Sequence, residues 1–197
     1  VGVLKFADLN NDGKINKGDW TLATPGDFRK IGNSASRYPY SFDLSADWKG
    51  FDIRGFFLGI GKRDWYAGGG NHYFWGIYAQ PWTNVQTHNL DHWTPENPNA
   101  YYPRVKAYIA ESTGSELACV QTRYMQDASY LRMKNLTIGY TLPQDLTRKL
   151  NIERVRFYFS GENLFEITHL KANLDPEALD SSSKVYPLQR SYSFGVN

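Results

Sequence analysis

The sequence lacks any run of about 18 apolar residues, which is the length that a helix needs to span a membrane. A transmembrane helix is therefore excluded, whereas a transmembrane β-barrel is not, because its alternating strands leave only a weak hydropathy signal. The mean hydropathy of −0.55 fits a soluble protein or a barrel equally well. The chain begins at Val1 without a charged segment followed by an apolar one, so we expect any export signal to lie outside these 197 residues.

Cysteine is scarce, and an excess of charge of one sign is missing. Cys119 is the only cysteine, which excludes an intrachain disulfide. The 22 basic and 20 acidic residues leave a net charge of +2, which is too small to indicate a nucleic-acid-binding surface. We therefore expect no nucleic acid among the partners of the chain.

The sequence patterns of enzymes are missing as well. There is no Gly-rich phosphate loop and no arrangement of a nucleophile with a base. Carboxylate pairs for glycoside hydrolysis could be chosen, such as Asp91 with Glu96 or Asp175 with Glu177. That chemistry needs a fixed separation between two carboxyl groups, and no strand pattern fixes one here. We therefore predict that the chain is not an enzyme.

Alternating apolar and polar residues, in contrast, are prominent. Residues 40–48 carry aromatic or aliphatic side chains at every second position and Ser or Asp between them, which is typical of a strand with one apolar face. Similar alternation recurs further along, and one intervening segment is Gly-rich and less regular. The predicted strands are residues 40–48, 51–62, 130–142, 155–164 and 190–197.

One of these strands carries two basic residues at unexpected positions. In residues 130–142, strict alternation puts Arg132 and Lys134 on the same side as Leu136 and Ile138. Long basic side chains can extend toward water at a membrane boundary while their stems stay on apolar surface. We therefore expect Arg132 and Lys134 on the apolar face, near its edge.

The connections between these strands alternate between short and long. The Lys49-Gly50 connection and residues 143–153 are short, whereas residues 63–128 and 165–189 are long. Transmembrane barrels have short periplasmic turns and longer extracellular loops. The pattern predicts an all-β fold: the C-terminal portion of an antiparallel transmembrane β-barrel, with about five strands and long extracellular loops. A soluble β-sandwich is the alternative, although its turns usually recur every 8–12 residues or so.

Several longer stretches resemble the C-terminal region of the SusC/RagA-type TonB-dependent outer-membrane transporters. The resemblance covers nearly the whole chain. The matching stretches are residues 61–66 (GKRDWY), 91–104 (DHWTPENPNAYYPR), 126–140 (QDASYLRMKNLTIGY), 159–165 (FSGENLF) and 186–197 (YPLQRSYSFGVN).

The resemblance implies a multi-pass protein of the Gram-negative outer membrane, in contact with its lipid. Residues 1–197 would be the C-terminal part of a barrel of about 22 strands, with the plug domain and the N-terminal strands outside this chain. A SusD-like surface lipoprotein would act as a lid, and the TonB complex would act through the missing N-terminal part. The implied function is import of oligosaccharides, that is, glycan uptake. A peptide-importing relative with the same barrel is an alternative.

A calcium-like motif lies near the start of the chain. Residues 8–19 match the EF-hand-type loop, with oxygen ligands at alternate positions and a glycine at the sharp turn. Calcium prefers about six to eight oxygen ligands. The predicted ligands for Ca²⁺ are Asp8, Asn10, Asp12, Lys14 through its carbonyl, and Asp19. A polar turn without a metal is the alternative.

The long connection is rich in aromatic residues. Aromatic rings can stack on sugar rings, while a few polar groups orient the hydroxyls. They can equally pack the loop into a stable cap or contact the lid. The residues predicted to contact substrate or lid are Trp65, Tyr66, Trp75, Trp82 and Trp93. Together with the calcium-like motif, these aromatics also fit a secreted calcium-binding carbohydrate-binding module.

Overall fold

The computed structural model describes residues 2–106, 110–112, 115–179, 186 and 188–197. These residues form two compact units. The sheet unit contains residues 34–65, 126–179 and 188–197, and the loop unit contains residues 2–33 together with the described part of 66–125. Among the described residues, no helix combines the length and the apolar character needed to cross a membrane.

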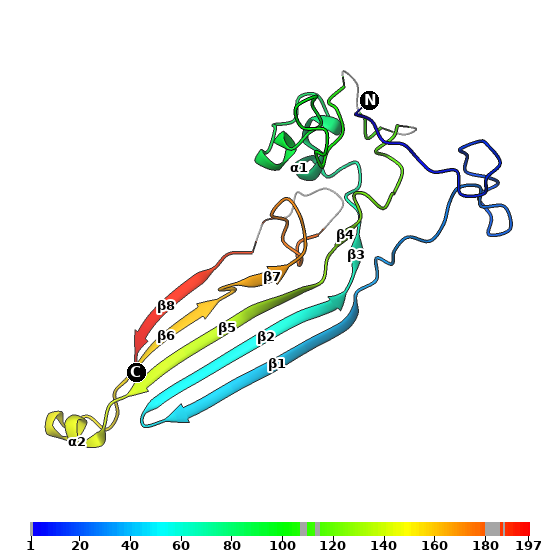
Figure 1. Cartoon of the computed structure of the whole chain (residues 1–197). Helices are drawn as coiled ribbons and strands as arrows, with labels where there is room; N and C mark the ends of the chain where they lie inside the picture. Colours follow the sequence, from blue (N-terminus) through cyan, green and yellow to red (C-terminus); the bar gives the residue numbers. More distant parts are fainter. Residues whose placement is uncertain (1, 107–109, 113–114, 180–185, 187) are drawn as a thin grey trace. The chain divides into compact units, whose positions relative to one another are not determined.

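The sheet unit is built on one antiparallel sheet of six strands, the five that the sequence predicts and one short additional strand, β7 (Figure 1). The strand order is β1-β2-β5-β6-β8, and the short β7 pairs with β5 beyond the end of β6. A separate two-stranded ladder joins β3 (Asp64–Trp65) to β4 (Gln126–Asp127). The strands of the sheet are β1 (Arg37–Trp48), β2 (Phe51–Lys62), β5 (Tyr130–Thr141), β6 (Arg156–Glu162), β7 (Glu166–Thr168) and β8 (Ser191–Val196).

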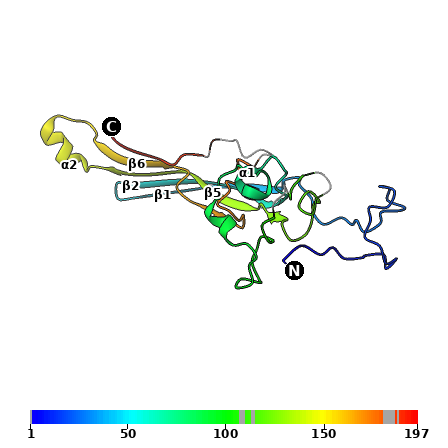
Figure 2. The same cartoon turned by 90° about the horizontal axis from the view of Figure 1, so that it is seen from above.

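The short connections meet at one end of the sheet, here called the turn end. Lys49 and Gly50 both have positive φ, at 47° and 89°, which allows the tight reversal between β1 and β2. The β5–β6 connection contains α2 (Gln144–Thr147) and η3 (Arg148–Leu150), and it lies beyond the ends of these strands in both views (Figures 1 and 2). Both long connections therefore leave the sheet at its opposite end, the loop end.

Strand pairing sets one apolar row across all five long strands. Ala46 pairs with Ile53, Ile53 with Ile138, Ile138 with Phe159, and Phe159 with Phe194. Directly paired residues lie on the same face of a sheet. The alternation predicted from the sequence is thus confirmed, and the apolar residues of separate strands form one continuous face.

The neighbouring row is polar throughout. Ser45 pairs with Arg54, Arg54 with Thr137, Thr137 with Ser160, and Ser160 with Ser193. Because successive residues point to opposite sides of a strand, this row lies on the other face. The sheet is consequently two-faced, with an apolar face and a polar face.

A β-bulge in β5 changes the alternation. Phe57 pairs with Met133, but Phe56 pairs with Asn135, so Lys134 is an extra residue in β5. An extra residue shifts every later side chain of that strand to the opposite face.

The bulge corrects the expectation for Arg132 and Lys134. Met133 and Leu136 lie on the apolar face on either side of the bulge, so Arg132 lies on the polar face. Arg132 and Lys134 both contact Glu177, which shows that Lys134 also reaches that side. The prediction from strict alternation was wrong here because nothing in the local sequence indicates the inserted residue.

The loop unit has little regular structure. Its elements are α1 (His72–Trp75), η1 (Gly76–Tyr78) and η2 (Thr87–Leu90). The helix α1 is capped by Asn71, whose side chain accepts a hydrogen bond from the backbone amide of Phe74 at 2.9 Å. Aromatic side chains, rather than long strands or helices, form the core of this unit.

Candidate functional site

The apolar face of the sheet is exposed along its length. Aromatic and aliphatic side chains there have large exposed fractions, up to 68% for Trp48 and 82% for Phe194. A soluble monomer rarely exposes so large a continuous apolar surface, which marks a protein or membrane contact. The exposed residues of this face are Tyr40, Phe42, Leu44, Trp48, Phe51, Ile53, Ile138, Phe157, Phe165, Ile167, Tyr192, Phe194 and Val196.

Toward the turn end, the sheet unit carries a cavity of about 710 Å³ that includes residues of the polar face. Arg54, Arg154 and Arg156 line it together with Asp52 and Thr137. Arg156 is held by Asp52, and the other two arginines add positive charge beside this pair. The polar face therefore offers charged and hydroxyl groups to water or to polar ligands.

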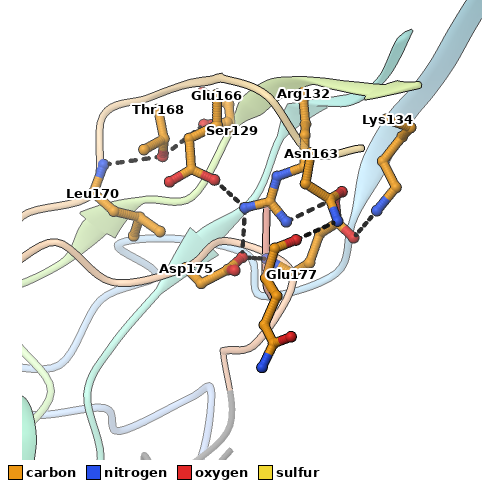
Figure 3. A network of polar contacts seen from close by, with 10 residues as sticks. Ser129, Arg132, Lys134, Asn163, Glu166, Thr168, Leu170, Asp175 and Glu177 are labelled. Atoms are coloured by element: carbon orange, nitrogen blue, oxygen red, sulfur yellow. Dashed lines mark hydrogen bonds and ion pairs between the residues drawn. The ribbon is translucent and has the colours of Figure 1, made fainter. Parts of the chain in front are cut away.

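At the loop end, the polar face carries a cluster of charged residues (Figure 3). Arg132 donates to the Asp175 carboxylate at 2.8 Å and also to Glu166. Its second terminal nitrogen, Nη1, lies 3.2 Å from Oε1 of Glu177. Lys134 pairs with the other oxygen of Glu177 at 3.0 Å. Asp175 and Glu177 are therefore engaged by cations of β5.

The aromatic residues of the loop unit pack mainly on one another. Trp75 lies at the centre, and its ring contacts Phe74, Tyr102 and Tyr124 edge-on. Its indole N–H donates to the carbonyl of Ala67 at 2.8 Å. This arrangement matches the alternative in which the aromatics stabilise the loop as a cap.

Buried tyrosines satisfy their hydroxyl groups through backbone carbonyls. Tyr78 donates to Pro103 at 2.6 Å, and Tyr102 donates to Phe74 at 2.9 Å. Burial raises the pKa of Tyr124 to about 12. The same desolvation raises the pKa values of Tyr78 and Tyr102 still further, so all three remain neutral donors at physiological pH.

The five predicted contact residues have different surroundings. Trp65 and Trp75 are buried, and the Tyr66 hydroxyl donates to the carbonyls of Leu117 and Cys119. Trp93 is half-buried, and its ring is close to Gly2. Trp82 is 77% exposed and lies in the same connection. The structure thus leaves Trp82 the most accessible of the five.

The calcium-like loop is closed by hydrogen bonds within the chain. Asp8 Oδ2 accepts from the amide of Gly13 at 2.8 Å, and Asp12 Oδ1 accepts from the amide of Lys14 at 2.8 Å. Asn10 bridges to Asp12, whereas Asp19 accepts from the hydroxyl of Thr24. Among the described residues, no group of three acidic, His or Cys side chains is close enough to hold a metal ion.

Sequence reasoning missed the residue that organises this loop. Asp27 accepts from the amide of Leu9 at 2.6 Å and from the amide of Asn16 at 2.8 Å, so its carboxylate joins the two ends of the loop. The hydrogen bond from Asn16 is the main reason why the pKa of Asp27 is lowered, and the one from Leu9 adds to it. No spacing rule indicates Asp27, because it lies outside the twelve-residue motif.

Comparison with known proteins shows that the chain is similar to TonB-dependent receptors. No family model matches the chain. TonB-dependent receptor P3 of Formosa agariphila is 29% identical over 98% of the chain. TonB-dependent receptor P26 of the same organism is 25% identical over 100% of the chain. The chain spans 18% and 19% of the lengths of these two receptors.

Two solved structures of a RagAB peptide transporter also resemble the chain. The RagAB peptide transporter matches 79% of this chain with 28% identity and a TM-score of 0.55, and the match covers 16% of the solved chain. The RagAB peptide importer in its closed-closed state matches 85% with 25% identity and a TM-score of 0.62, covering 18% of the solved chain. These likenesses confirm the resemblance to the SusC/RagA-type transporters predicted from the sequence motifs. The two relatives are named as receptors and both RagAB structures as a transporter or importer, which fits a chain that is not an enzyme.

Proposed function

We propose that the chain forms the C-terminal wall of a TonB-dependent importer in the Gram-negative outer membrane. The observation that carries this proposal is the two-faced sheet, with an exposed apolar row from Ala46 to Phe194 and a polar row behind it. Lipid would cover the apolar face, and the polar face would line the pore of a closed barrel. The long connections at the loop end would then be extracellular, and the short connections periplasmic.

Adjacent positions in β1 test this proposal. Leu44 is 58% exposed on the apolar face, and Ser45 lies next to it on the polar face. In the full-length protein, Leu44→Arg should weaken membrane assembly by about 2–4 kcal/mol if Leu44 faces lipid near mid-membrane. Ser45→Arg should assemble like the wild type. Assembly is measured by outer-membrane fractionation and by folding into lipid vesicles.

Two results would contradict the proposal. One is equal assembly of Leu44→Arg and Ser45→Arg, since both faces would then meet the same environment. The other is a full-length protein that stays soluble and monomeric without detergent, which would favour the secreted carbohydrate-binding module.

For the cargo, we propose oligosaccharides delivered with a SusD-like lipoprotein lid. The aromatic loop unit supports this proposal, since the exposed ring of Trp82 could stack on a sugar. Peptide import is the second candidate, and it is favoured by the likeness to the RagAB peptide transporter. Calorimetric titration of the complete transporter and lid with glycan and peptide libraries distinguishes the two.

We also propose that the loop at residues 8–19 holds a calcium ion. Asp8 Oδ1 is buried without a hydrogen-bond partner, and the surrounding side chains offer carboxylate and amide oxygens, which are the ligands that calcium prefers. Calcium should raise the melting temperature of the full-length protein, and a chelator should reverse this. Asp8→Ala should abolish the shift, whereas the exposed Asp145→Ala should keep it. An unchanged melting temperature after chelation would contradict the proposal.

A further inference from the structure

Arg132 is buried although it lies on the polar face of the sheet. The bulge at Lys134 directs it there, and its side chain is only 2% exposed. On the same face, Ser45 near the turn end is exposed. Something therefore covers the polar face at the loop end.

The cover is the chain that follows β7, residues 169–179. Glu166, Asp175 and Glu177 all place carboxylates against the Arg132 guanidinium, and Lys134 binds Glu177 as well (Figure 3). A planar guanidinium with five N–H groups suits several carboxylates at once, which a lysine ammonium does less well.

Further contacts fix this segment at its start and in its middle. The Thr168 hydroxyl lies 3.4 Å from the carbonyl of Ser129, and Thr168 also belongs to β7, which pairs with β5. The amide of Lys171 donates to the side-chain oxygen of Gln126 at 3.2 Å. Near its end, Pro176 is fully buried. The segment is therefore held against β5 and β4 along its length.

We propose that residues 169–179 fold into the pore, that Arg132 latches them there through Asp175 and Glu177, and that this latched segment limits the size of cargo that can pass. The inference rests on the proposed function, because only a barrel wall makes the polar face the inside of a pore. Arg132 is a positioning residue: it acts through the segment that it holds. Its removal would leave three carboxylates close together without their shared cation, and their repulsion would release the segment.

Cysteine labelling of the purified full-length transporter tests this inference. Cys119→Ser removes the native thiol, and Lys171→Cys places a reporter at an exposed position of the segment. A small methanethiosulfonate should label the reporter, whereas a maleimide on a long polyethylene-glycol chain should react at least tenfold more slowly. A second reporter, Leu146→Cys in α2, should react with both reagents because it lies beyond the turn end.

Variants of the latch then identify the role of Arg132. Arg132→Gln should make Lys171→Cys react with the large reagent at nearly the rate for Leu146→Cys, and Arg132→Lys should restore part of the protection. Asp175→Asn tests the latch without altering β5. It should also make Lys171→Cys react faster with the large reagent. Arg190→Gln removes an exposed arginine outside the cluster and should change nothing.

The outcomes separate this inference from the function on which it rests. Equal labelling by both reagents in the wild type, or unchanged protection in both Arg132→Gln and Asp175→Asn, overturns the latch. If Leu44→Arg and Ser45→Arg still differ in membrane assembly, the proposed function stands despite that result. If they do not differ, both proposals fail.

Discussion

The guanidinium of Arg156 in β6 reaches across β5 to the carboxylate of Asp52 in β2. Arg156 Nε lies 2.9 Å from Asp52 Oδ1, and its Nη2 lies 2.5 Å from Oδ2. Gly139 of β5 lies between the two strands, and a Cβ atom there would be 2.4 Å from the guanidinium and 2.5 Å from the carboxylate. The ion pair depends on the missing side chain of Gly139.

Gly139→Ala should therefore destabilise the sheet. The added methyl group forces Arg156 and Asp52, both half-buried, apart, and we expect a loss of about 1–3 kcal/mol. Thermal or denaturant unfolding of the full-length protein measures the loss. Gly68→Ala is the matched control, since a Cβ at Gly68 meets nothing within 4 Å. Equal stability of the two variants would show that the pair tolerates the methyl group.

Substitution of two tryptophans should separate packing from binding in the loop unit. Trp75 is fully buried, so Trp75→Ala should cost about 3–5 kcal/mol of stability through the cavity that it leaves. Trp82→Ala removes an exposed ring and should leave melting unchanged while weakening cargo or lid binding. Unfolding and calorimetric titration are measured on the same preparations. A lower melting temperature for Trp82→Ala, or an unchanged one for Trp75→Ala, would contradict these separate roles of the two tryptophans.

The carboxyl group of Glu111 should make the loop unit pH-sensitive. Burial raises its pKa from the ordinary value of 4.5 to about 7, so the folded state binds its proton more tightly than the unfolded state. Stability from this group is then present below the unfolded pKa and is lost as the pH rises from about 4.5 through 7. Amide exchange of residues 66–79 should accelerate over this range. Glu111→Gln should remove the effect, whereas Glu96→Gln, at an exposed position, should retain it.

Asp27 should control the order of the N-terminal loop. Its carboxylate accepts hydrogen bonds from Leu9 and Asn16, and these lower its pKa. The stabilisation is present above the unfolded pKa and is lost as the pH falls through the lowered value. Asp27→Ala should speed exchange of the Leu9 and Asn16 amides at neutral pH. Unchanged exchange at both amides would mean that other contacts hold the loop.

The local sequence predicted the regular part of the fold well. The strands expected at residues 40–48 and 51–62 lie within β1 and β2, and the predicted connections have the observed order of short and long. The prediction of these strands succeeded because a strand with one apolar face has an apolar residue at every second position. The bulge at Lys134 was missed because one inserted residue changes the facing of its neighbours without changing their chemical type.

The site was predicted less completely. The calcium-like motif was visible from its spacing, but the role of Asp27 was not, because its hydrogen bonds close a loop from outside the motif. The aromatic content of the loop was also visible. Which rings are buried, such as Trp75, and which are exposed, such as Trp82, depends on contacts between distant residues.

The sequence by itself determined the two-faced strands, the sides from which the long loops leave, and the resemblance to TonB-dependent transporters. Each of these depends on neighbouring residues or on a continuous motif. Only the tertiary structure decided that Arg132 is buried under Glu166, Asp175 and Glu177, and that Arg156 meets Asp52 over Gly139. Those partners are separated by 34 residues or more. Strand register and a single bulge bring them together, and local periodicity does not encode either.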